Sequence, residues 1–307
     1  MRMKTIGAGD AAISIPAVGL GCNAFGRRID AAATGRVVHA AIDAGITFFD
    51  TAEGYGNGQS EDFIGRALGA RRGQVVIATK FGWGLEHVPG KGTGSRENIR
   101  IAVEGSLKRL RTDVIDLYQI HKPDPKTPIG ETLAAMDALV TEGKVRLIGC
   151  SNFSTAQLDE AMRVARDAGI SSFVTAQNRW SVLNRGIEDD LAPACASHGV
   201  GILPYYPLER GLLTGKYRRG EAAPEGARLG GAETGSADFD TIEALERFAI
   251  SRGHDLLTLA VSWLASKDVV ASVISGASRP EQLAVNAAAG NWELTPDDYA
   301  EIDRILT

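Results

Sequence analysis

Short runs of aliphatic and β-branched residues alternate along the chain with longer segments in which apolar residues recur every three or four positions. The short runs are bounded by polar or glycine-rich turns and are typical of buried strands, whereas the longer spacing places apolar side chains on one face of a helix. We therefore expect strands at residues 17–21, 46–50, 75–80, 114–121, 145–150, 173–177, 201–205 and 270–275. The clearest helices are expected at residues 30–44, 96–110, 129–142 and 155–168.

Several expected helices carry recognisable end signals. Asp30 precedes the apolar-periodic segment "AAATGRVVHAAIDAG" and is a candidate N-cap. In "SNFSTAQLDEAMRVARDAG", Ser154 is the expected N-cap, Gln157 stands at the third helical position, and Gly169 ends the helix. This pattern predicts a capping box at one end and a left-handed glycine at the other.

A strand followed by a helix, repeated eight times, predicts parallel strands covered by helices, and eight repeats favour a closed (β/α)₈ TIM barrel over an open doubly wound sheet. The segment "KTIGAGDAAISI" near the N-terminus predicts a short β-hairpin that caps the bottom of the barrel. Residues 209–239, after the seventh strand, are rich in glycine, alanine and charge and predict a long loop, a feature that is usually functional. No linker divides the chain, so we expect residues 1–307 to form one domain.

Composition limits the classes of partner. A net charge of −5 disfavours nucleic acid and anionic membranes, and no apolar run approaches the length of about 18 residues that spans a bilayer. The three cysteines (Cys22, Cys150 and Cys195) are widely spaced, and the basic N-terminus lacks an apolar signal region, so we expect a cytoplasmic protein with reduced thiols. The five histidines show no metal-binding spacing, so no metal is expected.

Reactive side chains stand where three consecutive expected strands end. Asp50 ends the second strand, Lys80 the third and His121 the fourth, and Tyr55 lies in the loop directly after Asp50. Active sites of such barrels are built at the C-terminal ends of the strands. Each residue has an ordinary structural explanation when taken singly, but the four together predict a catalytic site.

The chemistry of this set points to proton transfer at a carbonyl group. A tyrosine phenol has a reference pKa of about 10, and a lysine ammonium within about 4–6 Å is expected to lower the pKa of Tyr55. Asp50 would hold Lys80 charged, and His121 would orient and polarise a carbonyl oxygen. The set is suited to protonating that oxygen while a hydride reaches the carbon, which requires a cofactor.

The motifs "GITFFDTAEGYGNGQSEDFIGRAL", "ATKFG", "DLYQIHKPD", "GCSNFS", "AQNRWS", "PLERGLLTGKY" and "GASRPEQLAVNAAA" follow one another over essentially the whole chain. In order and spacing they resemble the aldo-keto reductase family. The resemblance implies an NADP(H)-dependent oxidoreductase on a (β/α)₈ barrel that interconverts a carbonyl compound and an alcohol. It also implies that Tyr55 donates the proton, that Lys80 and Asp50 tune Tyr55, and that His121 orients the carbonyl.

The same resemblance implies a set of cofactor-binding residues. Ser151, Asn152 and Gln177 match positions that bond the nicotinamide carboxamide, and Tyr205 matches the aromatic residue that stacks on its ring. The remaining expected contacts, from the pyrophosphate to the adenosine end, are Leu208, Gly211, Lys216, Gly276, Ser278, Arg279, Gln282 and Asn286. Arg279 near a helix start suits a 2′-phosphate and hence NADP over NAD. The chain departs from the family pattern at Tyr206, Ser275 and Val285, of which Val285 replaces a Glu that often touches the adenine amine.

Phe25, Trp83 and Trp180 follow the first, third and sixth expected strands and are candidates to line an apolar substrate pocket. Packing of these aromatic residues within their own loops is the alternative. "GLGCNA" fits a dinucleotide fingerprint only superficially, because the next helix signal comes at Asp30, and "GLLTGKY" lacks the spacing and the Ser/Thr of a phosphate loop.

Two other functions stay open at this stage. A cofactor-binding regulatory or redox-sensing subunit would bind NADPH and turn over slowly. A Schiff-base aldolase would use Lys80 as a nucleophile, although pairing with Asp50 keeps a lysine protonated and works against that role.

Overall fold

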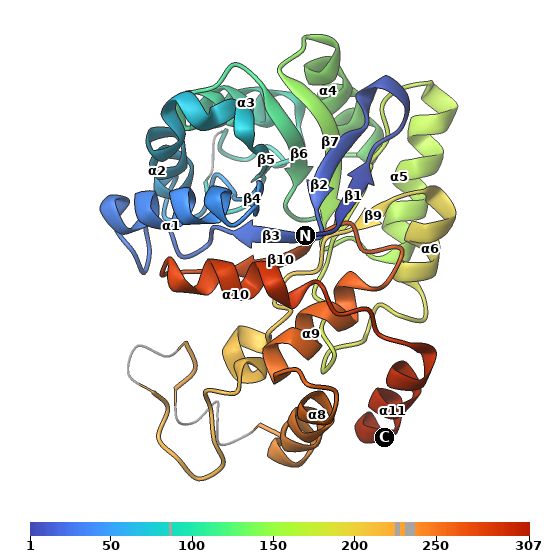
Figure 1. The fold of residues 1–307 in the computed structure, drawn as a ribbon. Helices are drawn as coiled ribbons and strands as arrows, with labels where there is room; N and C mark the ends of the chain where they lie inside the picture. The colour runs from blue at the N-terminus through green and yellow to red at the C-terminus, as the bar shows by residue number, and fades with distance from the viewer. Residues whose placement is uncertain (86–87, 225–227, 231–236) are drawn as a thin grey trace.

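The structure is a computed structural model that describes residues 1–85, 88–224, 228–230 and 237–307. Eight parallel strands form its central sheet, in the order β10-β3-β4-β5-β6-β7-β8-β9 (Figure 1). The strands are β3 (Val18–Gly21), β4 (Phe48–Asp50), β5 (Val76–Phe81), β6 (Ile115–Ile120), β7 (Val145–Ser151), β8 (Thr175–Gln177), β9 (Gly201–Ile202) and β10 (Val273–Gly276). From β4 to β9, each strand pairs in parallel with the strand that precedes it along the chain, as the alternating sequence pattern predicts.

The two ends of this sheet meet. β10 pairs in parallel with β3, and parallel bridges join Ile202 to Val270 and Tyr205 to Ile274, on the side of β9. The backbone amide of Ile274 donates to the carbonyl of Pro204 over 3.0 Å. The sheet is therefore closed into a barrel, and the expected (β/α)₈ fold is confirmed.

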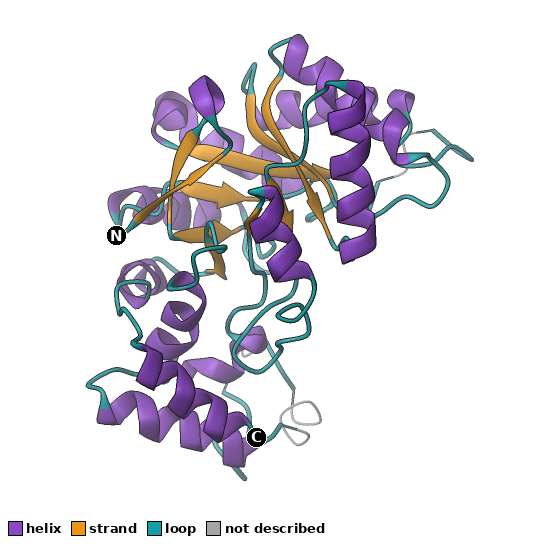
Figure 2. Cartoon of the chain, turned by 90° about the vertical axis from the view of Figure 1, so that its right-hand side faces the viewer, coloured by secondary structure: helices purple, strands orange, loops and turns teal. Residues whose placement is uncertain are grey.

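Helices surround the strands (Figure 2). Those that alternate with the strands are α1 (Ala31–Asp43), α2 (Gln59–Leu68), α3 (Arg96–Leu110), α4 (Ile129–Thr141), α5 (Thr155–Ala168), α6 (Leu191–His198), α9 (Leu256–Ala265) and α10 (Glu281–Ala289). Two more, α8 (Phe239–Ser251) and α11 (Pro296–Leu306), lie together at the lower side of Figure 1, and there are 3₁₀ turns η1 (Gly9–Ala11), η2 (Gly69–Gln74) and η3 (Glu209–Thr214). No helix in the described part of the chain is long and apolar enough to cross a membrane.

The helix ends follow the expected chemistry. Asp30 accepts a 2.8 Å hydrogen bond from the amide of Ala33 at the start of α1. α5 begins with the predicted capping box between Ser154 and Gln157 and ends at Gly169, whose φ is +64°. These local signals act through backbone groups within one turn, which explains why they could be predicted without knowledge of the tertiary structure.

The N-terminal hairpin pairs β1 (Met3–Ile6) antiparallel with β2 (Ile13–Pro16). Ile6 and Ile15 are buried and belong to one apolar cluster with Leu117 and Leu147 of the barrel strands. The hairpin therefore closes one end of the barrel with apolar side chains, as expected, and leaves the opposite end for chemistry.

The segment after β9 begins as a structured turn. Residues 209–214 form η3, and Glu209 is buried and accepts hydrogen bonds from Ser181 and Arg179. Further along, the amide of Leu229 donates to the hydroxyl of Tyr217 over 3.0 Å, and both side chains are buried. The loop expected at 209–239 therefore has buried residues at its start and at Tyr217 and Leu229, whereas residues 218–222 are exposed, and residues 225–227 and 231–236 of it lie outside the described residues.

Candidate active site

The four candidate catalytic residues come from neighbouring strands. Asp50 is the last residue of β4, Lys80 lies in β5, and His121 directly follows β6, where its amide donates to the carbonyl of Phe81 over 2.9 Å. Tyr55 lies in the loop between β4 and α2. Because the strands are parallel, their C-terminal ends share one rim, and the structure brings all four residues to it.

Glycines fit this loop against its neighbours. A Cβ atom added at Gly54 would lie 2.3 Å from the carbonyl oxygen of Trp83, and Gly56 has a φ of +58°. Such close approach and left-handed backbone are open only to glycine at low cost. The two glycines therefore place the backbone so that Tyr55 faces the rim.

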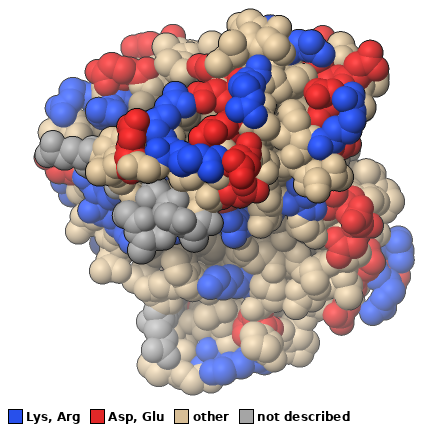
Figure 3. All heavy atoms as spheres, turned by 90° about the horizontal axis from the view of Figure 1, so that it is seen from below, with Lys and Arg blue, Asp and Glu red and all other residues tan. Residues whose placement is uncertain are grey.

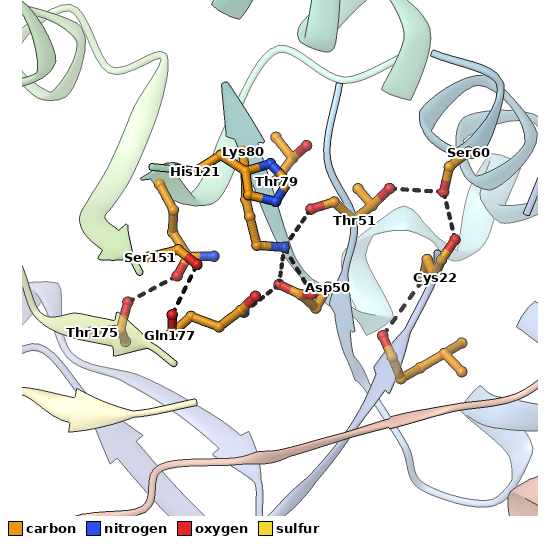
Figure 4. Close-up of polar contacts among 12 residues, drawn as sticks. Cys22, Asp50, Thr51, Ser60, Thr79, Lys80, His121, Ser151, Thr175 and Gln177 are labelled. Carbon is orange, nitrogen blue, oxygen red and sulfur yellow. Dashed lines mark hydrogen bonds and ion pairs between the residues drawn. The ribbon is translucent and has the colours of Figure 1, made fainter. Parts of the chain in front are cut away.

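Lys80 and Asp50 form a buried ion pair. Lys80 Nζ lies 2.7 and 2.8 Å from the two Asp50 carboxylate oxygens and 2.8 Å from the carbonyl oxygen of Thr51 (Figure 4). Lys80 is 0% and Asp50 3% exposed. Gln177 Nε2 donates to Asp50 Oδ1 over 2.8 Å, so the carboxylate is held from two sides. The three ammonium hydrogens of Lys80 have three acceptors, and the pair is fully satisfied.

Tyr55 lies over this pair and beside His121. Lys80 Nζ is 5.3 Å from the centre of the Tyr55 ring, and the Tyr55 and His121 rings meet edge to face at 5.8 Å. Burial, and next the negative charge of Asp50, raise the pKa of Tyr55 well above its usual value. The expectation that Lys80 lowers the pKa of Tyr55 is therefore wrong for this structure, because Asp50 neutralises Lys80 and also acts on the phenol. Tyr55 is held as a protonated phenol.

His121 is a neutral imidazole at physiological pH. Burial, followed by the positive charges of Lys80 and Lys122, lowers the pKa of His121 to about 3. Its ring lies 5.0 Å from that of Trp83, and its Nδ1 is buried without a hydrogen-bond partner among the described residues. Because His121 lines the cleft, its neutral imidazole can orient an oxygen there, but it cannot serve as an acid near pH 7.

A cleft of about 1190 Å³ opens at this rim, lined by Asp50, Tyr55 and His121, while Lys80 lies fully buried behind the wall. The residues expected from the family resemblance also line it, namely Ser151, Asn152, Gln177, Tyr205, Leu208, Gly211, Lys216, Gly276, Ser278, Arg279, Gln282 and Asn286. These positions are spread from β7 to α10. The structure therefore gathers all of the expected cofactor residues around one cavity beside the catalytic set.

The residues expected at the carboxamide form a hydrogen-bonded network. Asn152, with a φ of +61°, donates from Nδ2 to the carbonyl of His121 and to Ser151 Oγ, and its Oδ1 accepts from the hydroxyl of Tyr205 over 2.8 Å. Ser151 Oγ donates to the carbonyl of Gln177 over 2.8 Å. The network ties β7, β8 and the segment after β9 together and fixes the polar floor of the cleft.

The turn at η3 has an unusual backbone. Glu209, Arg210 and Gly211 have φ values of +42°, +57° and +108°. A Cβ atom at Gly211 would lie 3.1 Å from Lys216 Cε, so the Lys216 side chain lies directly over this backbone. Consecutive residues outside the ordinary α and β regions cost energy and cluster at ligand-binding sites. A lysine over a concave backbone suits an anion.

The backbone amides at the start of α10 were expected to be available to an anion, and the structure differs from that expectation. Gln282 Oε1 accepts from the amides of Ser278 and Arg279 over 2.9 and 3.1 Å. These two amides are therefore already bonded, and an anion there would depend on the side chains. Val285 is 47% exposed and lines the cleft beside them, while Asn286 is buried.

The three aromatic candidates for the substrate pocket lie in different environments. Trp83 is 45% exposed and lines the cleft, but Phe25 and Trp180 are 0% and 2% exposed and lie in the hydrophobic core, away from the cleft lining. Trp180 packs against Trp263 at 6.1 Å and donates from its indole nitrogen to Glu188. We therefore no longer assign Phe25 and Trp180 to the substrate pocket.

Five further cations line the cleft and belong to neither the catalytic set nor the expected cofactor residues: Arg27, Arg28, Lys122, Arg210 and Arg228. The sequence itself shows two adjacent arginines after the first expected strand and a lysine directly after His121, and these could have indicated positive charge near the rim. Their convergence depends on the tertiary structure. In the described part of the chain, no group of three or more His, Cys, Asp and Glu side chains is arranged to hold a metal ion.

Comparisons with known proteins agree on one family. A model of the aldo/keto reductase family matches residues 17–307. An aldo-keto reductase of Bacillus subtilis (strain 168) is 35% identical over 310 residues, covering 97% of this chain and 92% of that protein. A probable voltage-gated potassium channel subunit beta of Oryza sativa subsp. japonica is 33% identical, with 92% of this chain and 90% of that protein covered.

An L-glyceraldehyde 3-phosphate reductase of Escherichia coli (strain K12) is 32% identical and covers 96% of this chain and 90% of its own length. Among solved structures, the glycerol dehydrogenase of Gluconobacter oxydans has a TM-score of 0.85 at 33% identity, covering 99% of this chain and 94% of that chain. The resemblance seen in the sequence motifs is confirmed, and this chain belongs to the aldo/keto reductase family of oxidoreductases.

Proposed function

We propose that residues 1–307 form a single-domain, NADP(H)-dependent oxidoreductase that interconverts a small carbonyl compound and an alcohol. The observation that carries the proposal is the convergence of Tyr55, His121 and the buried Lys80–Asp50 pair on one large cleft. The expected cofactor residues line the same cleft. A cytoplasmic location remains a prediction.

The cleft fits a nicotinamide dinucleotide. Its volume of about 1190 Å³ exceeds the roughly 300–1,000 Å³ of an ordinary small-ligand pocket. Its lining pairs an amide-rich floor at Asn152 and Gln177 with cations at Lys216 and Arg279, which matches a carboxamide at one end and phosphates at the other. The bound nicotinamide would supply the hydride.

Proton delivery falls to Tyr55. Because the pKa of Tyr55 is raised by burial, the phenol carries its proton throughout the physiological range and can give it to a carbonyl oxygen. His121, neutral and lining the same cleft, would hold that oxygen in place. Lys80 Nζ lies 5.3 Å from the centre of the phenol ring, so the Lys80–Asp50 pair provides a rigid polar support that needs no reorganisation during the reaction.

Arg279 supports the preference for NADP over NAD. Arg279 lines the cleft just before α10, and the family resemblance expects the adenosine end and a 2′-phosphate there. We expect Arg279→Gln to weaken NADPH binding by about tenfold or more and to leave NADH binding nearly unchanged. Fluorescence titration with both cofactors measures this, and equal losses for the two would refute the assignment.

The direct test of the catalytic assignment is Tyr55→Phe. This variant should lose most turnover of carbonyl substrates, a loss of about 10²-fold or more, while it still binds NADPH. Tyr118→Phe is the matched control, because Tyr118 is equally aromatic and fully buried, yet its hydroxyl has no partner among the described residues. Near-normal turnover by Tyr55→Phe would overturn the assignment.

A second candidate function is a cofactor-binding regulatory subunit with slow turnover. It is favoured by the similarity to proteins described as probable voltage-gated potassium channel beta subunits. Turnover against a panel of aldehydes, ketones and sugars, with NADPH binding measured on the same preparation, separates the two. Tight binding without turnover of any carbonyl would favour the regulatory function.

The structure argues against a Schiff-base aldolase. Lys80 is fully buried, and its ammonium hydrogens are taken by Asp50 and Thr51. A nucleophilic lysine must lose a proton and reach the substrate, and neither is open to Lys80 in this arrangement. Borohydride treatment with substrate should therefore leave no adduct on the protein by mass measurement.

A further inference from the structure

Four cations line the cleft in addition to Arg210 and the expected cofactor residues Lys216 and Arg279. Arg27 and Arg28 lie in the loop between β3 and α1, Lys122 follows His121, and Arg228 belongs to the segment between η3 and α8. All four line the cleft that contains Tyr55. The carboxylates in that lining are Asp50, which is paired with Lys80, and Glu281 at the start of α10.

These cations lack acidic partners within the described residues. No ion pair or side-chain hydrogen bond joins Arg27, Arg28, Lys122 or Arg228 to a described carboxylate, whereas Arg218 and Arg219, close by in sequence, pair with acidic residues at Glu246, Glu243 and Asp240. Basic and acidic side chains are interspersed on the face seen in Figure 3. The chain as a whole carries a net charge of −5. The unpaired positive charge is therefore a local property of the cleft.

The arginines act on one another. Burial, and then the positive charges of Arg228 and Arg27, lower the pKa of Arg28. Like charges gathered in one place repel, and an anion placed among them would relieve that repulsion and accept hydrogen bonds from several guanidinium groups. Partial burial and mutual repulsion of these positive charges are typical of an anion-binding site and not of a solvated surface.

Aromatic side chains link the cations to the catalytic residues. Lys122 Nζ lies 4.9 Å from the centre of the Trp83 ring, which is itself 5.0 Å from the His121 ring. Arg228 lies 4.8 Å from the ring of Tyr206, which contacts Tyr205 edge to face at 5.2 Å. Lys122 is therefore one aromatic ring away from His121, and Arg228 is one aromatic ring away from Tyr205.

We propose that Arg27, Arg28, Lys122 and Arg228 bind an anionic group of the substrate, a carboxylate or phosphate remote from the carbonyl that is reduced. The preferred substrates are then anionic aldehydes or ketones. This inference rests on the proposed carbonyl reductase function. A cofactor phosphate is the other source of the same chemistry, and the experiment distinguishes the two.

The test compares matched anionic and neutral aldehydes. The pairs are 4-carboxybenzaldehyde with methyl 4-formylbenzoate, and glycolaldehyde phosphate with glycolaldehyde, each assayed with saturating NADPH. For at least one pair we expect kcat/KM to favour the anionic member by about tenfold or more at low salt. The preference should shrink when salt is raised from about 20 to 300 mM.

Variants assign the preference to the cluster. The double variant R27Q/R28Q should reduce the anionic-to-neutral ratio to about twofold, mainly through a higher KM for the anionic member, because an ammonium and one guanidinium remain. R36Q is the matched control, since Arg36 is an exposed arginine of α1 outside the cleft lining. It should retain the wild-type ratio.

Results that contradict the anion-site inference can be told apart from results that contradict the proposed function. Equal kcat/KM within both pairs, or a ratio that R27Q/R28Q leaves unchanged, would overturn the inference while leaving carbonyl reduction intact. Equal losses for anionic and neutral aldehydes together with weaker NADPH binding would assign the cluster to the cofactor and also overturn it. A wild type that reduces none of the four aldehydes would overturn the proposed function itself.

Discussion

The buried ion pair behind Tyr55 provides the sharpest energetic prediction. Lys80 Nζ makes three short contacts, to both carboxylate oxygens of Asp50 and to the carbonyl of Thr51, and Asp50 receives one further bond from Gln177. Lys80→Met removes three of these four bonds and leaves a buried carboxylate whose remaining partner is the Gln177 amide. Asp50→Asn leaves a buried ammonium without a counter-charge.

The cost follows from this geometry. Breaking a buried pair by removing one partner typically costs about 3–5 kcal/mol, because the remaining charge is left uncompensated. That is a large part of the roughly 5–15 kcal/mol by which a folded domain is stable. The double variant K80M/D50N carries no buried charge at this position. Its loss should therefore be smaller than the sum of the two single losses by about 2–3 kcal/mol.

Urea unfolding of the four proteins measures this coupling. Circular dichroism and tryptophan fluorescence are followed in parallel, and coincident transitions justify a two-state treatment. The exposed pair Arg163–Asp167 of α5, 3.3 Å apart with both side chains 58% exposed, is the control. Its cycle with R163M and D167N should couple by less than about 0.5 kcal/mol. Losses at Lys80 and Asp50 that add to within about 0.5 kcal/mol would refute the reasoning.

Three further predictions concern pH, packing and capping. The pKa of His121 is about 3 in the folded state and about 6.5 in the unfolded chain, so between pH 7 and 5 the unfolded chain takes up the proton. From pH 7 to 5 the unfolding free energy of the wild type should therefore fall by about 2 kcal/mol more than that of His121→Asn. Parallel falls of the two proteins in urea titrations would contradict this. Gly54→Ala should force backbone apart at the carbonyl of Trp83, 2.3 Å from the new Cβ, and lower kcat/KM by about tenfold or more, whereas Gly73→Ala, with nothing within 4 Å, should not; equal activities would refute the packing argument. Ser154→Ala removes the capping box of α5 and should cost about 1 kcal/mol in urea unfolding, and an unchanged midpoint would show that the cap contributes nothing.

Local sequence signals predicted helix ends well where capping residues and glycines determine them. The bounds of α3 and α5 agree with the expectation, because their serine N-caps and the glycine that ends α5 act within one turn. β9 is shorter than expected, ending at Ile202 instead of residue 205. Pro204 has no amide hydrogen to continue a regular ladder, and the chain keeps only isolated bridges beyond it.

The catalytic set was predictable for a related reason. Parallel strands place their C-terminal ends at one rim, so Asp50, Lys80 and His121 could be brought together by counting strands alone. The same count could not place loop side chains. Phe25 and Trp180 also follow strand ends, yet both are buried in the core, because neighbouring elements cover them.

By itself, therefore, the sequence determined the order of strands and helices, the barrel, and which reactive residues share its rim. Only the tertiary structure decided what surrounds them. The pKa of Tyr55 is raised rather than lowered because burial, and next the negative charge of Asp50, disfavour the phenolate. Arg27, Arg28, Lys122 and Arg228 become a cluster only when three separate segments fold over one cleft. Periodicity is a local property of the chain, whereas burial and electrostatic fields depend on distances between segments that are far apart in sequence.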